Sequence, residues 1–252
     1  MDFTVIDGKK RLLDSYRPLP STIVTNLKEH LLVEWTYHSN AIEGNTLTLS
    51  ETKVVLEGIT VGGKSLREHF EVINHAEAIR LVEELADKNT PLSEFAIKEI
   101  HQLILKNIRD RDAGSYRTIN VFIQGSSHVP PMSSLVPGLM RDLIEWYEGE
   151  GQSLHPIERA AKFHHQFVHI HPFVDGNGRT ARLLTNLILM QEGYPVAVIR
   201  QEDRGIYYEA LRIADETGDI ESLTTLVSAS IERMLDVYLW ALGLTDPTNN
   251  HK

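Results

Sequence analysis

The chain has 252 residues, of which 42% are hydrophobic and 24% charged, the balance of a folded protein with one large or two small domains. Its formal net charge of -10 disfavours general binding to nucleic acids or anionic membranes. Cysteine is absent, which excludes disulfides, thiolate nucleophiles and Cys-ligated metals. No apolar run approaches the roughly 18 residues that span a bilayer, and the start MDFTVIDGKK does not resemble a signal peptide. We therefore expect a cytoplasmic protein with no nucleic-acid or membrane partner.

The first predicted element is a helix over residues 21–38. Apolar side chains recur in it at spacings of three and four, at Val24, Leu27, Leu31 and Trp35. Gly44 and Asn45 indicate its C-terminal end. Glu43 then lies at the end of the helix dipole that prefers a cation, so it is either simply exposed or paired with a positive group.

Most of the remaining chain also shows helical patterns. Ser65 and Glu68 form a capping box that opens a helix. Thr90-Pro91 is predicted to open the next, with isoleucines inward at 97, 100, 104 and 108, and Pro137 opens a further one. Additional helices are expected over residues 160–170, 179–191, 203–214 and 220–242.

One segment differs from this pattern. Residues 115–131, SYRTINVFIQGSSHVPP, are rich in β-branched and aromatic side chains around Gly125. This composition predicts a short surface β-hairpin, with an irregular loop as the alternative.

The stretch HPFVDGNGRTAR, residues 171–182, concentrates groups suited to phosphate chemistry. Pro172 ends one helix, and the Gly-Asn-Gly turn at 176–178, whose residues tolerate positive φ, leads into the next. Backbone N–H groups at such a turn and helix N-terminus form an anion-binding nest. Arg179 and Arg182 lie three residues apart, so they share a helix face and are expected to reach the same anion.

Two further side chains of this stretch suggest roles. A carboxylate beside a phosphate nest is understandable if Asp175 holds a divalent cation that bridges phosphates. His171, at the other mouth of the loop, is placed to act as a general base. Each feature alone is commonly structural, but their concentration in twelve residues favours a site.

These residues resemble the Fic family, whose signature His-Pro-Phe-x-(Asp/Glu)-Gly-Asn-Gly-Arg-x-x-Arg is matched at all nine fixed positions. Residues 114–117 and the predicted hairpin are similar to the family's flap, and Tyr207 to Asp219 to its C-terminal helical element. The resemblance implies a mainly α fold: a Fic-type helical bundle with a short β-hairpin flap beside the active site. It divides the chain into an N-terminal helical segment with an inhibitory motif (1–62), a Fic catalytic core (63–245) and a polar tail (246–252).

The resemblance implies a protein adenylyltransferase, which transfers AMP from ATP to a Ser, Thr or Tyr hydroxyl of a target protein. By position, His171 would deprotonate the hydroxyl, and Asp175 would hold Mg²⁺ between the α- and β-phosphates. The phosphate-binding residues would be Gly176, Asn177 (backbone and side chain), Gly178, Arg179 for the β-phosphate and Arg182 for the γ-phosphate.

Further implied roles concern the base and the target. Tyr208 and Leu211 would wall the adenine pocket, while Asp215 departs from the Asn frequent in relatives and leaves base contacts open. The target segment would pair with flap residues Thr118, Ile119, Asn120, Val121, Phe122, Ile123, Gln124 and Gly125. Relatives are often dimers, so a homodimer is a further implied partner.

Ser39-x-x-x-Glu43-Gly44-Asn45 resembles the family's inhibitory motif. The resemblance implies that Glu43 pairs with Arg182, blocks the γ-phosphate site and keeps the protein nearly inactive. In some relatives this glutamate also supports removal of AMP from the target, which leaves a second activity open here.

Three alternatives remain at this point. His165 and His169 are spaced i, i+4 within HHQFVHIH, which suits zinc in a metal hydrolase, although the sequence identifies no third ligand. Transfer of another phosphate-containing group, or kinase activity, is known for relatives with altered signatures, whereas this chain keeps Gly-Asn-Gly. The intact signature argues against the third alternative, a non-enzymatic binding module.

Overall fold

The computed structural model describes residues 1–245, which form ten α-helices and three short 3-10 helices. The α-helices are α1 (Thr4–Asp14), α2 (Ser21–Ile42), α3 (Leu49–Leu56), α4 (Leu66–Asp87), α5 (Glu94–Leu105), α6 (Val136–Glu148), α7 (Pro156–Ile170), α8 (Asn177–Gln191), α9 (Arg204–Thr217) and α10 (Glu221–Ala241). The 3-10 helices are η1 (Ser133–Leu135), η2 (Glu150–Ser153) and η3 (Gln201–Asp203). The expected mainly α architecture is therefore confirmed, and the predicted tail 246–252 lies outside the described residues.

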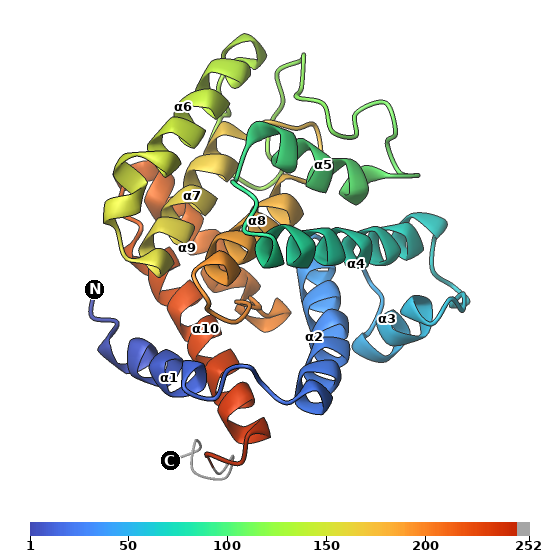
Figure 1. Cartoon of the computed structure of the whole chain (residues 1–252). Coiled ribbons are helices and arrows are strands. Elements are labelled where there is room, and N and C mark those ends of the chain that lie inside the picture. Colours follow the sequence, from blue (N-terminus) through green and yellow to red (C-terminus); the bar gives the residue numbers. More distant parts are fainter. Residues whose placement is uncertain (246–252) are drawn as a thin grey trace.

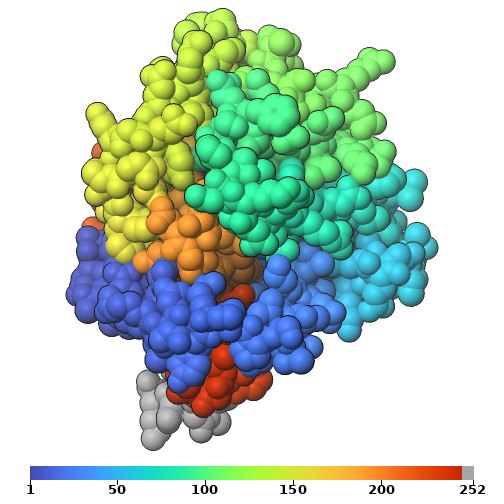
Figure 2. Space-filling model, in the orientation of Figure 1, coloured from blue at the N-terminus to red at the C-terminus, as the bar shows by residue number. Residues whose placement is uncertain are grey.

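Helix α8 is the central element of the bundle. Twelve of its fifteen residues are buried, because α7, α4 and α5 pack around it. Figure 1 shows α8 in the middle, with α4 and α5 on one side and α7 on the other. On the face drawn in Figure 2, orange atoms lie between yellow, green and blue segments. Helix α8 is thus enclosed by α4, α5 and α7 along most of its length.

The N-terminal helices share the main hydrophobic core. One cluster of buried side chains extends from Phe3 in the N-terminal residues to Leu239 in α10. Figure 1 shows α1 lying against α10. Helices α1 and α3 were not predicted from the sequence. In α3 a capping box at Thr48 and Glu51 is present, but only eight residues follow, too few for a clear periodic stripe.

Helix starts follow local capping signals. The capping box predicted at Ser65 is confirmed, since its hydroxyl accepts from the backbone N–H of Glu68. The next helix begins later than predicted: Ser93, not Thr90-Pro91, caps α5 by accepting from the N–H of Ala96. Ile108 lies beyond the end of α5.

The predicted β-hairpin over residues 115–131, called the flap segment below, is wrong: no strand is found in this part of the described chain. The buried Arg117 anchors the segment by donating to the carbonyls of Ile119 (3.1 Å), Pro131 (2.5 Å) and His171 (2.8 Å). Pro130 and Pro131 lack the N–H donors that a ladder needs. Side-chain anchoring therefore replaces strand pairing here, and the segment forms irregular loops (Figure 1).

Among residues 1–245, no helix combines the length and apolar character that crossing a membrane requires.

Candidate active site

The loop between α7 and α8 turns through two left-handed residues. His171 follows the end of α7 with φ 50° and ψ 59°, and Gly176 precedes α8 with φ 77°. A Cβ on Gly176 would lie 3.1 Å from Ile104. Glycine is required at this position both for its backbone conformation and for the space it leaves.

The side chains of Asn177 and His101 brace this loop. Asn177 donates to the carbonyl of Phe173 and accepts from its N–H, both at 2.9 Å, so its buried amide shapes the loop in this structure instead of facing a ligand. His101 stacks on Phe173 with ring centroids 3.5 Å apart. It donates from Nε2 to the carbonyl of Asp175 (2.9 Å) and accepts at Nδ1 from Gly114 (3.0 Å). The sequence offered no signal for His101, because its partners are distant in the chain.

Gly178 is a glycine for a reason that the sequence did not reveal. Positive φ is found at Gly176 but not at Gly178, which is the second residue of α8. A Cβ at Gly178 would collide with the carboxylate of Glu43. The glycine therefore allows Glu43, from the end of α2, to approach the first turn of α8.

His171 is placed as a neutral imidazole. Burial lowers its pKa to about 4, and the nearby charges of Arg117 and His128 act in the same direction. The ring is therefore unprotonated near neutral pH, as a general base must be.

Asp175 is an ionised carboxylate with several positive neighbours. Burial alone would raise its pKa, but Arg179, the N–H of Gly176 and Arg67 together lower it. Gly176 donates to Oδ1 at 2.7 Å, and Arg67 donates to Oδ2 at 2.9 Å. Oxygen donors of this kind suit Mg²⁺, which usually takes one or two protein carboxylates and completes its shell with phosphates and water. Because the Arg67 side chain is half exposed, it is free to leave the carboxylate to a cation.

The two arginines of the signature lie on α8 but point to different carboxylates. Arg179 has Asp175 at 3.4 Å and Glu71 at 3.6 Å. Arg182 donates to Glu43 Oε1 at 2.7 Å, to the Ser39 hydroxyl at 3.1 Å and to the Ser39 carbonyl at 2.8 Å. Both arginines are buried, and each contacts a different set of carboxylates in this arrangement.

Helix α9 holds the end of α2 beside this arginine. Arg204 Nε donates to the carbonyl of Ile42 at 2.8 Å, and the Tyr208 hydroxyl lies 3.5 Å from the same oxygen. Tyr208, predicted to wall the base pocket, is 40% exposed, and Leu211 is partly buried against the main core. Arg204 was not identified from the sequence, because only the fold reveals its partner.

The flap segment lies against the His171 loop. Arg117 ties the two together through the carbonyl of His171. Among the predicted target-pairing residues, Ile119 and Phe122 are 60% and 86% exposed. Large apolar side chains that are exposed in this way are available for contact with a partner chain.

The site combines a neutral histidine, an ionised carboxylate, a glycine turn at a buried helix N-terminus and two buried arginines. These groups suit the binding of phosphate-containing ligands. Residues 91–189 match the model of the Fic/DOC family. The chain is similar in sequence to curated proteins named "Protein adenylyltransferase Fic". It is 45% identical to the protein from Nematostella vectensis, over 81% of this chain and 48% of that protein. It is 37% identical to the protein from Drosophila willistoni, over 94% of this chain and 47% of that protein. It spans about half the length of these relatives.

Solved structures extend the comparison. A Fic domain containing signaling protein from Bacteroides thetaiotaomicron is similar with a TM-score of 0.87 and 31% identity over 96% of this chain and 97% of that chain. Fic-1 from C. elegans gives a TM-score of 0.84 and 34% identity over 96% and 72%. The chain belongs to the Fic family, which confirms the resemblance found in the sequence.

Proposed function

We propose that this chain is an ATP-dependent protein adenylyltransferase, which transfers AMP to a Ser, Thr or Tyr hydroxyl of a target protein and of itself. The main support is the gathering of His171, Asp175 and Arg179 around the N-terminus of α8, where backbone N–H groups favour phosphate. The names of the curated relatives are consistent with this activity.

The proposed reaction uses few groups. The target hydroxyl oxygen attacks the α-phosphorus of ATP, the bond from that phosphorus to the oxygen bridging the β-phosphate breaks, and pyrophosphate leaves. The neutral His171 takes the hydroxyl proton. Arg179 and the turn at 176–178 orient the phosphates, and positioning and charge neutralisation account for most of the rate gain in such transfers.

Asp175 would hold Mg²⁺ in this reaction. The ion would supply positive charge to the α- and β-phosphates when bound. The chain itself contributes an ionised carboxylate that is only partly exposed, fixed by the N–H of Gly176 at 2.7 Å.

The same proposal includes autoinhibition by Glu43. Arg182 is the arginine assigned to the γ-phosphate, and its guanidinium is engaged by Glu43 and Ser39. A carboxylate on this cation competes with a phosphate for the same donors. In this proposal the N-terminal segment 1–62 acts as the inhibitory part and 63–245 as the catalytic core.

Further parts of the proposal concern the flap segment and the base. Residues 118–125 would align the target's backbone, and Tyr208 and Leu211 would contact adenine. A homodimer, and removal of AMP assisted by Glu43, belong to the same set of proposals.

The test uses Glu43→Gly protein with ATP labelled at either the α- or the γ-phosphate, in a cell lysate. The proposal expects protein labelling from α-labelled ATP alone, and its loss in the Glu43→Gly, His171→Ala double variant with an unchanged circular dichroism spectrum. Labelling from γ-labelled ATP alone, or full labelling by the double variant, contradicts it.

A further inference from the structure

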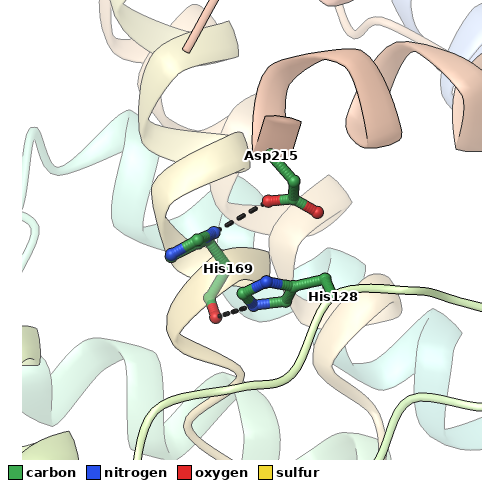
Figure 3. A group of neighbouring side chains, drawn as sticks. All are labelled: His128, His169 and Asp215. Carbon is green, nitrogen blue, oxygen red and sulfur yellow. Dashed lines mark hydrogen bonds and ion pairs between the residues drawn. The ribbon is translucent and has the colours of Figure 1, made fainter. Parts of the chain in front are cut away.

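A second cluster of side chains lies outside the signature residues assigned above. His128 of the flap segment, His169 of α7 and Asp215 of α9 each place one ligand atom within 4.8 Å of those of the others (Figure 3). We propose that these three side chains bind a divalent transition metal, with Zn²⁺ as the best match, and that the bound ion ties the flap segment to the helical core.

His128 already has the hydrogen bonding of a metal ligand. Its Nε2 lies 2.8 Å from the carbonyl of His169, and because a carbonyl only accepts, Nε2 carries the proton of the neutral ring. The lone pair is therefore on Nδ1. Metal-bound histidines typically donate their second ring N–H to a carbonyl or carboxylate in this way.

Asp215 and His169 supply the other two donors. His169 Nδ1 lies 2.7 Å from Asp215 Oδ1, and Figure 3 shows the second carboxylate oxygen pointing away from His169. A metal ion entering here displaces the proton between these two atoms. The His169 side chain is 41% exposed, so its ring is able to take a proton on Nε2, which leaves Nδ1 for the metal.

His165 contacts the carboxylate of the cluster without being one of the three proposed ligands. Its Nε2 lies 3.0 Å from Asp215 Oδ1, one turn of α7 before His169. This contact fixes the carboxylate, which is the role that surrounding hydrogen bonds play at metal sites. The i, i+4 histidine pair noted in the sequence therefore meets its carboxylate in α9, and the third ligand comes from the flap segment.

The donor set and spacing match a specific class of ion. Two imidazole nitrogens and one carboxylate oxygen favour Zn²⁺ over Mg²⁺, whose preferred ligands are all oxygen. Tetrahedral ligands at about 2.1 Å from zinc lie about 3.4 Å apart. Ligand atoms within 4.8 Å of one another reach that spacing through small shifts, and His128 lies in an irregular loop that is able to make them.

Zinc titration by calorimetry on the full chain without nucleotide tests the proposal, so the result does not depend on the proposed transferase activity. Substitutions His128→Ala, His169→Ala and Asp215→Asn should each weaken Zn²⁺ binding at least about tenfold, while His165→Ala should weaken it less. His30→Ala, at an exposed histidine of α2, is the matched control and should bind as the wild type does. The substituted His128 lies in a loop, so the fold should be retained.

Limited proteolysis tests whether bound zinc holds the flap segment against the helical core. Zn²⁺ should slow proteolysis within residues 118–127 of the wild type and leave the His128→Ala rate unchanged. Unaltered zinc affinity in His128→Ala would overturn the proposal, since zinc would then sit on the α7 histidine pair alone. Wild-type protein that fails to bind zinc at millimolar concentration would overturn it as well.

Discussion

Glu43 and Arg182 lie 139 residues apart in the chain, and their side chains meet at 2.7 Å beside the first turn of α8. Three features allow this contact: α2 ends at Ile42, Arg204 holds that end, and Gly178 leaves room for the carboxylate. Burial would lower the pKa of Arg182, but Glu43 is the main partner that raises it. The guanidinium is therefore a firmly charged group, and in the proposed autoinhibition its pairing with Glu43 competes with binding of a phosphate.

Replacing Glu43 with Gly should raise self-adenylylation at least about tenfold, a change that corresponds to about 1.4 kcal/mol of differential binding. The reason is that Arg182 loses its competing carboxylate. Incorporation of α-labelled AMP into the purified protein measures the effect.

Glu57→Gly is a matched control for this substitution. Glu57 also caps a helix and precedes a glycine, but its carboxylate contacts only Lys53, at 4.0 Å, among the ion pairs of residues 1–245. It should leave activity at the wild-type level. Equal activation by both substitutions would show that loosening a helix end, not freeing Arg182, is responsible.

Replacing Ser39 with Ala should activate the protein less than replacing Glu43. The substitution removes the hydroxyl that accepts from Arg182 Nε at 3.1 Å but keeps the backbone carbonyl that accepts at 2.8 Å. A single hydrogen bond contributes about 0.5–1.5 kcal/mol, so a rise of roughly two- to tenfold is expected in the same labelling assay. Activation equal to that of Glu43→Gly would contradict the dominant role given to the carboxylate.

Replacing Arg67 with Ala should lower the Mg²⁺ concentration needed for half-maximal labelling. Arg67 donates to the Asp175 oxygen that a cation would use, and half-exposed ion pairs contribute up to about 1 kcal/mol, which predicts a shift of about two- to fivefold. Magnesium titrations in the Glu43→Gly background measure it.

Arg80→Ala, at an exposed arginine of the same helix, is the control and should not change the magnesium requirement. An increased requirement in Arg67→Ala would mean that Arg67 assists ATP binding, which is opposite to this prediction.

The sequence predicted those features that depend on neighbouring residues. The capping box at Ser65, the helix end at Gly44 and the loop before α8 follow from patterns within a few positions. The contact of Arg67 with Asp175 spans 108 residues and is created by the packing of α4 on α8, so no spacing rule reveals it.

The hairpin was mispredicted for a related reason. The β-branched composition of residues 118–123 is a local signal, whereas strand pairing needs a partner with free N–H groups. The buried guanidinium of Arg117 and the prolines at 130 and 131 determine the backbone of the flap segment instead. Likewise, the partners of Asp175 and Arg182 are side chains distant in the sequence, Arg67 and Glu43, which only the helical bundle brings close.

The stability of the fold in acid is expected to depend on the buried His164 and its hydrogen-bond partners. The Thr185 hydroxyl donates to the carbonyl of Ala181 at 2.8 Å, so it accepts from His164 Nδ1 at 2.9 Å. His164 Nε2 is left to accept from the Tyr207 hydroxyl, also at 2.9 Å. This arrangement requires a neutral ring. Burial, with help from the charge of Arg182, lowers the pKa of His164 to about 3.

The sign of the pH effect follows from proton binding. An unfolded histidine takes up a proton near pH 6.5, whereas folded His164 and His101 do so only near pH 3 and pH 4. Between these values the unfolded chain binds more protons, so the free energy of unfolding falls as pH decreases, by about 1 kcal/mol per pH unit for each group. Thermal denaturation at pH 7.5, 6.0 and 5.0 should show this loss. His101→Gln should reduce the pH dependence and the exposed His30→Gln should not; equal slopes in all three proteins would contradict the assignment.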